Sequence, residues 1–320
     1  MNKRAGSPWT GCGIVAVKEI NDHLRSARML VLELLVLLTG IAAVYSAIQG
    51  LRTTTGQDAF LFLRLFTDAR NPMPSFAGIL VFLIPLMAIG LGFDGVNGEF
   101  NRRTMSRILA QPIFRDALLL GKFLAGLATL SIGLLSLWLL VIGLGLLTLG
   151  IPPGGSEVAR ALSFLLLAVL YGGLWLAIAL FMSTVFRSPA TAALSSLGLW
   201  LFFSVLWPML SQFLAAAIYP NDAALLLGVQ SIEQLQAQQW LSRISPGALF
   251  EEAMVGVLSP MTRSLGLVFP EQMRGAVNGA PLGFVQSLLL VWPQVTGLVA
   301  AMILLFVGTY VSFQRQEVRA

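Results

Sequence analysis

The sequence predicts an all-α polytopic membrane protein, and two observations support that prediction. Of the 320 residues, 57% are hydrophobic and only 11% are charged, whereas soluble domains carry about a quarter charged residues. The apolar residues also collect in six long runs, and about 20 apolar residues suffice for a helix to cross a bilayer. We therefore expect one transmembrane domain over residues 1–320, with six transmembrane helices.

The predicted spans alternate with short polar segments that orient them. An even number of spans places both termini on one side, and assigning that side as cytoplasmic leaves most Lys and Arg residues inside, as the positive-inside rule requires. Residues 219–281 then form an extracytoplasmic helical segment. The predicted spans cover residues 29–51, 76–93, 117–149, 161–186, 190–218 and 282–313.

Residues 1–28 precede the first span and contain an amphipathic pattern. Such a helix lies in the membrane interface with its apolar face towards lipid. The alternative is a plain cytoplasmic extension of the first span. The apolar positions are Ile14, Val17, Ile20 and Leu24, and the polar positions are Lys18, Glu19, Asp22 and Arg25.

The content of cysteine, histidine and basic residues excludes several classes of site. A single cysteine, Cys12, and a single histidine, His23, cannot build a disulfide or a multi-histidine metal centre. The net charge of +5 comes without a basic run interleaved with aromatics, so we expect no nucleic acid partner. We expect most of the protein surface to contact the lipid bilayer.

Between the second and third predicted spans lies a loop with a helical pattern of its own. Residues 100–110 place apolar side chains on one half of a helix and the arginines 102, 103 and 107 on the other. Because Gln111 precedes Pro112, the helix should end near Ala110. The basic face could dock on a soluble partner or bind anionic lipid headgroups, and the pattern alone favours neither.

This loop also carries an ordered motif. The sequence Asp94, Gly98-Glu99, Thr104, Leu109, Pro112, Arg115, Gly121-Lys122 resembles the cytoplasmic motif of type-2 ATP-binding cassette (ABC-2) exporter permeases, and in particular that of NosY-like members. The resemblance extends to Lys18-Glu19-Ile20, Ser183-Thr184 and Ser245-Pro246. One position departs from the family pattern, because Arg103 stands where the family has a small residue.

The resemblance implies a transport subunit and not an enzyme. Two permeases would pair in the bacterial inner membrane, and separate ATPase subunits would bind ATP and Mg²⁺. This chain should not itself bind ATP, because Gly121-Lys122 lacks the upstream glycine of a phosphate loop. The alternative function is a subunit that relays ATPase work to an extracytoplasmic partner without moving substrate. The implied ATPase-coupling residues are Glu99, Arg102, Arg103, Arg107 and Arg115.

Four further residues are candidates for function. Glu33 and Asp94 lie near the ends of predicted spans, where we expect ion pairs at the cytoplasmic interface in preference to a proton relay. By resemblance, Ser204 and Trp207 of the fifth span line the transport pathway, although aromatic side chains here also suit a lipid-facing interface.

Overall fold

The computed structural model describes residues 11–53, 60–69, 73–105, 114–150, 152–220, 231–265 and 281–315. Within these residues every element is a helix, and six helices are long and apolar enough to cross a membrane. The prediction of an all-α protein with six transmembrane helices is therefore confirmed. The six spans are Ala27–Leu51, Phe76–Asn101, Arg115–Leu149, Gly155–Val185, Pro189–Ile218 and Phe284–Arg315.

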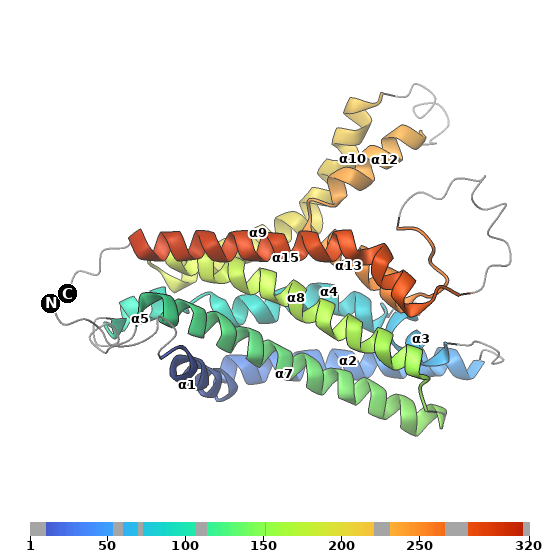
Figure 1. Cartoon of the computed structure of the whole chain (residues 1–320), viewed down its shortest axis with the longest axis horizontal. Coiled ribbons are helices and arrows are strands. Elements are labelled where there is room, and N and C mark those ends of the chain that lie inside the picture. The colour runs from blue at the N-terminus through green and yellow to red at the C-terminus, as the bar shows by residue number, and fades with distance from the viewer. Residues whose placement is uncertain are drawn as a thin grey trace.

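The helices follow one another along the chain from α1 to α15 (Figure 1). The first half of the chain forms α1 (Cys12–Leu24), α2 (Ala27–Thr53), α3 (Leu61–Thr67), α4 (Phe76–Gly92), α5 (Asn97–Asn101) and α7 (Arg115–Leu149). The second half forms α8 (Gly155–Val185), α9 (Pro189–Leu201), the π-helical turn η1 (Phe202–Leu206), α10 (Trp207–Ile218), α12 (Ile232–Ser242), α13 (Pro246–Leu258) and α15 (Phe284–Arg315).

Helix α8 is the centre of the bundle. It packs against α4, α7, α13 and α15, and 72% of an 18-residue apolar stretch within it is buried. At the end near α13, the buried guanidinium of Arg160 donates hydrogen bonds to the carbonyl oxygens of Val257 and Leu282 and to the hydroxyl of Ser287. This side chain therefore fixes the end of α13 and the start of α15 to the central helix.

Helix α4 contains Pro85, yet it continues without interruption. A proline has no N–H to donate to the carbonyl four residues earlier, which here belongs to Val81. The hydroxyl of Tyr171 in α8 donates to that carbonyl across 3.1 Å. The neighbouring helix thus satisfies the acceptor that the proline leaves free, as a membrane interior requires.

The fifth span is built differently from the others. It consists of α9, η1 and α10, and only 11% of an 18-residue apolar stretch within it is buried. Figure 1 shows α10 leaving the bundle and running beside α12 as a projecting hairpin, before the chain returns to the bundle through α13. We call α10 and α12 together the projecting hairpin.

Helices α1 and α5 and the Arg315 end of α15 lie at one end of the bundle, and α3 lies at the other (Figure 1). We call the first end the α5 end. Helix α1 is separate from the first span, because the chain turns at Arg25 and Ser26 before α2 begins. The Ser26 hydroxyl caps α2 by accepting a hydrogen bond from the amide of Met29.

The polar segment after the fifth span also folds into helices. Ser231 begins α12 with a capping box to Gln234, and Pro246 is the first residue of α13. Of the helical segment expected over residues 219–281, residues 221–230 and 266–280 lie outside the described residues.

Candidate functional site

At the α5 end, hydrogen bonds attach α5 tightly to the central helix, α8. The Ser183 hydroxyl, near the end of α8, accepts hydrogen bonds from the amides of Val96 and Asn97 at 3.0 and 3.2 Å. The Asn101 amide group donates to the carbonyl oxygen of Arg187 in the turn that follows α8. Helix α5 is therefore held at its first and last residues by one neighbouring segment.

Our prediction of a single amphipathic helix over residues 100–110 is wrong at the first turn of that helix. Helix α5 ends at Asn101, Arg102 caps it, and Arg103 has a φ of 54°. This left-handed conformation stops an α-helix. Residues 106–113, with Arg107 and Pro112, lie outside the described residues.

A Schellman motif explains why the helix stops there. The amide of Thr104 donates to the carbonyl oxygen of Glu99 at 3.0 Å, and the amide of Arg103 donates to that of Phe100 at 3.1 Å. These two bonds satisfy carbonyls at the end of α5 that have no helical partner. The left-handed position usually holds glycine, and here Arg103 occupies it.

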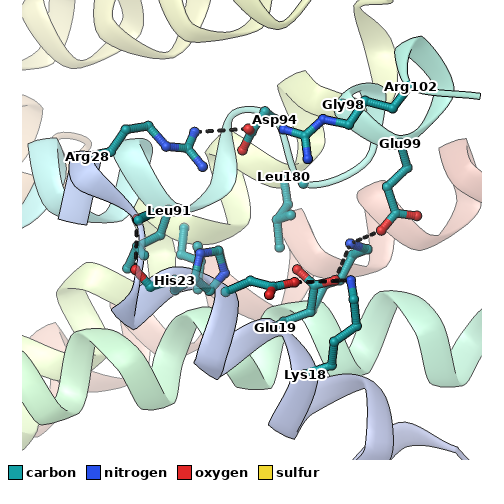
Figure 2. Close-up of a pocket in the computed structure, with 15 residues that line it drawn as sticks. Lys18, Glu19, His23, Arg28, Leu91, Asp94, Gly98, Glu99, Arg102 and Leu180 are labelled. Carbon is teal, nitrogen blue, oxygen red and sulfur yellow. Dashed lines mark hydrogen bonds and ion pairs between the residues drawn. The ribbon is translucent and has the colours of Figure 1, made fainter. Parts of the chain in front are cut away.

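A buried ammonium group joins three helices at this end. The Nζ atom of Lys122, in α7, lies 2.9 Å from Oε1 of Glu19 in α1 and 2.6 Å from Oε1 of Glu99 in α5. Only 5% of the Lys122 side chain is exposed, compared with 12% of Glu19 and 13% of Glu99. In Figure 2, Glu19 and Glu99 approach from separate helices towards the same polar cluster. We call Lys122, Glu19 and Glu99 the ion triad.

The ion triad borders a polar cavity of about 350 Å³. Basic and acidic side chains of α1, α2, α5 and α7 line the cavity together with His23 (Figure 2). Lys18 lies on its outer side, where its Nζ contacts Glu19 at 3.1 Å and Asp22 at 3.3 Å while the side chain stays 60% exposed. Positively and negatively charged side chains are nearly balanced in the lining, so the cavity favours neither an anion nor a cation.

Burial and charge shift two groups of α1 that face this cavity. Burial alone would raise the pKa of Glu19, but the charge and hydrogen bond of Lys122, with help from Lys18, hold this pKa below its ordinary value. Burial lowers the pKa of His23, and the charges of Glu19 and Arg28 act on it in opposite directions. Both shifts favour an ionised Glu19 and a neutral His23 near pH 7.

The two expected ion-pair residues lie in different surroundings. Asp94 forms an ion pair with Arg28, from Oδ2 to Nη1 at 2.9 Å, and the Arg28 guanidinium also lies 5.0 Å from the centre of the Phe93 ring. Glu33 is half-buried beside α7, where Gly133 leaves room for its carboxylate. Among the described residues, no basic side chain lies within ion-pair distance of Glu33.

The five expected coupling residues separate into an inner and an outer group. Glu99 is turned inward to Lys122, whereas Arg102 and Arg103 are exposed to solvent. Arg115 is the first residue of α7 and is half-buried, and Arg107 lies outside the described residues. The structure thus brings Glu99 into the ion triad and leaves Arg102 and Arg103 at the surface.

Ser204 and Trp207 lie far along the chain from this cluster, where the fifth span leaves the bundle. Ser204 is half-buried within η1. The indole Nε1 of Trp207 donates to the carbonyl oxygen of Leu241 in α12 at 2.9 Å. The visible role of the Trp207 ring is therefore to hold the two helices of the projecting hairpin together.

Sequence reasoning missed Lys122 as a member of the site. It treated Gly121-Lys122 only as part of the family motif and as an argument against a phosphate loop. The available signal was the position of Lys122 inside the apolar run 117–149, because an ionisable residue within a span is a functional candidate by default.

The comparison with known proteins then decides the family. A family model described as "ABC-2 family transporter protein" matches residues 14–318. The chain belongs to the ABC-2 transporter family. The expected resemblance is confirmed.

Two relatives of this ABC-2 protein are named as permeases. A "Probable ABC transporter permease protein NosY" of Pseudomonas aeruginosa is 30% identical over 207 residues, which cover 63% of this chain and 68% of the relative. A protein of the same name from Stutzerimonas stutzeri is 30% identical over 198 residues, covering 61% and 67%.

Membership of this family makes the chain a permease subunit of an ABC transporter and a multi-pass membrane protein. It also implies ATPase subunits as partners, because in this family the permease supplies the membrane part of the transporter. In this ABC-2 permease the ion triad bridges three helices at one end of the six-helix bundle.

Proposed function

We propose that this ABC-2 permease forms half of the membrane pathway of an exporter, and that ATPase subunits bind the segment from Glu99 to Arg115. The observation that carries the proposal is the placement of α5. It ends the second span, is anchored to the fourth, and presents Arg102 and Arg103 to solvent directly after its last residue.

The attachments of α5 suit it to transmit force. A push on Arg102 or Arg103 reaches α8 through Ser183 and reaches α7 through Lys122. Packed helices switch between discrete arrangements and do not deform continuously. An ATPase that moves α5 would therefore shift whole spans.

The fifth span supports pairing of two copies. Its apolar side chains are exposed along its whole length, although the other spans pack into one bundle. A second permease placed against this face would close the pathway between the copies, with Ser204 and Trp207 close to it. The exposed side chains include Leu194, Leu201, Val205, Met209 and Phe213.

We place the α5 end in the cytoplasm of a bacterial cell, with both termini there and the protein in the inner membrane. The basic residues in or next to α1, the two arginines that follow α5, and Arg115 at the start of α7 support this orientation. Residues 219–281, including α12 and α13, then face the opposite side and could meet an extracytoplasmic partner. ATP and Mg²⁺ would bind to the ATPase subunits, and this chain would need no cofactor.

Charge reversal tests the coupling assignment. Arg103→Glu combined with Arg107→Glu should prevent co-purification of the ATPase with the permease. Arg25→Glu combined with Arg315→Glu is the matched control, because it reverses two exposed charges at the same end outside the loop. Retention of the ATPase at normal stoichiometry in the first double variant would refute the assignment.

Transport assays test the exporter function. Vesicles containing the permease and its ATPase should accumulate substrate when ATP is supplied to the side of the α5 end. Hydrolysis without movement of any candidate substrate would instead indicate a relay to an extracytoplasmic partner. The two named relatives are permeases, which favours the exporter.

A further inference from the structure

We propose that Lys122 is a positioning residue that makes α1, α5 and the start of α7 move as one rigid unit. The inference rests on the proposed function, because it concerns how a push on α5 spreads through the permease. It adds a second lever, α1, which the expected ATPase contact does not include.

The first support is the close approach of α1 to α7. A Cβ atom on Gly121 would lie 2.9 Å from Cβ of Val15 and 3.0 Å from the carbonyl oxygen of Cys12. Any side chain larger than hydrogen at position 121 would therefore push α1 away from α7. Gly121 brings the two helices together, and the next residue, Lys122, bonds to both α1 and α5.

The second support is the charge balance of the ion triad. Two carboxylates, from Glu19 and Glu99, lie within hydrogen-bond distance of a single nitrogen atom that is almost fully buried. If the ammonium were removed, two carboxylates from different helices would face each other with little solvent between them, and like charges at such a site repel. Lys122 thus attracts two helices that would otherwise separate.

The third support is the outer face of α1. Ile14, Val17 and Leu24 are 75%, 61% and 44% exposed, on the side of α1 that does not pack on α7. An apolar helix face of this kind inserts into the membrane interface. Helix α1 leads directly into the first span through the cap at Ser26, so a displacement of α1 reaches α2.

These contacts form a continuous path between residues that are far apart in the sequence. A push on α5 passes through Glu99 to Lys122, from Lys122 to Glu19, and along α1 to the first span. The first span would then move with α4 and α7 without touching an ATPase.

A distance measurement tests the rigid unit directly. Spin labels on Asp22→Cys in α1 and Asn101→Cys in α5, both exposed positions, report the separation of the two helices in a Cys12→Ala background. The full-length permease in nanodiscs should give a narrow distance distribution that stays unchanged when ATPase and ADP–vanadate are added. Lys122→Met should broaden that distribution and make it depend on nucleotide, and Lys122→Arg should restore it.

Two further measurements separate positioning from simple structural damage. In the complex, Lys122→Met should lower kcat for ATP hydrolysis about tenfold with little change in KM for ATP, while the ATPase still co-purifies. Lys18→Met is the matched control, because Lys18 also contacts Glu19 but is exposed and bridges no second helix. It should leave the distances and kcat unchanged.

The outcomes distinguish this inference from the proposed function. An unchanged distance distribution in Lys122→Met overturns the rigid unit, whatever the ATPase does. A broadened distribution supports the rigid unit. If the ATPase also still co-purifies with the variant that combines Arg103→Glu and Arg107→Glu, the coupling site is refuted while the rigid unit stands. If Lys122→Met is not monodisperse, Glu99→Gln removes one of the two ion pairs and must broaden the same distribution for the inference to stand.

Discussion

The hydroxyl of Tyr171 donates a hydrogen bond to the carbonyl oxygen of Val81, the one backbone acceptor of α4 that Pro85 leaves without its helical donor. The two residues belong to different spans, α8 and α4, and both are buried. A side chain of one helix therefore completes the backbone of another. This relationship makes a proline tolerable in the middle of a buried transmembrane helix.

We expect Tyr171→Phe to destabilise the permease by about 1–3 kcal/mol, because it leaves a buried carbonyl without a donor. Thermal unfolding in detergent measures the loss. Restoring the helical donor with Pro85→Ala should offset part of it, so the double variant should be more stable than the two single changes predict. Strictly additive effects of the two substitutions would contradict the pairing.

Arg103→Gly should stabilise the turn after α5 by about 1 kcal/mol, because a side chain in the left-handed region costs about 1–2 kcal/mol. The amide of Thr104, which donates to Glu99, should then exchange its hydrogen more slowly. Arg102→Gly is the control, because Arg102 has a φ of −79°, and glycine there should speed exchange. Faster exchange in Arg103→Gly would contradict the strain at this position.

Acid should release α1 from α7 in two stages. The pKa of His23 is lowered in the folded protein, so its stabilising effect is complete above its unfolded value of about 6.5 and declines as the pH falls below it. The pKa of Glu19 is also lowered, so its contribution is lost as the pH falls from about 4.3 through the folded value. Hydrogen exchange of α1 amides, followed from pH 7 to well below pH 4, should show both stages.

Single substitutions assign the two stages. His23→Gln should remove the upper stage and leave the lower one, whereas Glu19→Gln should weaken α1 attachment wherever Glu19 is ionised, because Lys122 then keeps only one partner. An upper stage that persists in His23→Gln would show that another group causes it.

Trp207→Phe should loosen the projecting hairpin, because it removes the hydrogen bond to Leu241 and costs about 1 kcal/mol. Amides of α12 should then exchange about fivefold faster. Trp200→Phe is the control, because the Trp200 Nε1 is buried without a partner among the described residues. If both substitutions speed exchange equally, the Leu241 bond does not hold the hairpin.

The sequence predicted the spans well because their signal is local. Apolar runs longer than a bilayer is thick define helices whatever their neighbours, and the observed spans lie within a few residues of the predicted ones, with two exceptions. The second span continues through α5 to Asn101 and does not end at Phe93, and α8 begins at Gly155 and not at Ala161. Arg160 explains the difference in α8. A buried arginine interrupts the apolar run, and only its hydrogen bonds to Val257, Leu282 and Ser287 make its burial acceptable.

The candidate site was less predictable, because its contacts join distant residues. Lys122 is separated by 103 residues from Glu19 and by 23 from Glu99, and no periodicity in the sequence connects them. The helix expected through Arg103 was wrong because side-chain spacing carries no information on backbone handedness. The one available hint was the small residue that the family prefers where Arg103 stands.

The exposed face of the fifth span has a different meaning in lipid than it would have in water. A soluble protein would have to cover so many apolar side chains permanently, whereas acyl chains solvate them about as well as protein does. A dimer in which two copies meet along α9 and α10 would therefore be stabilised by shape complementarity more than by removal of apolar surface from water. Such a contact can open and reclose at a low cost in free energy. The bundle can stay intact meanwhile, because its central helix, α8, is far more buried than the fifth span.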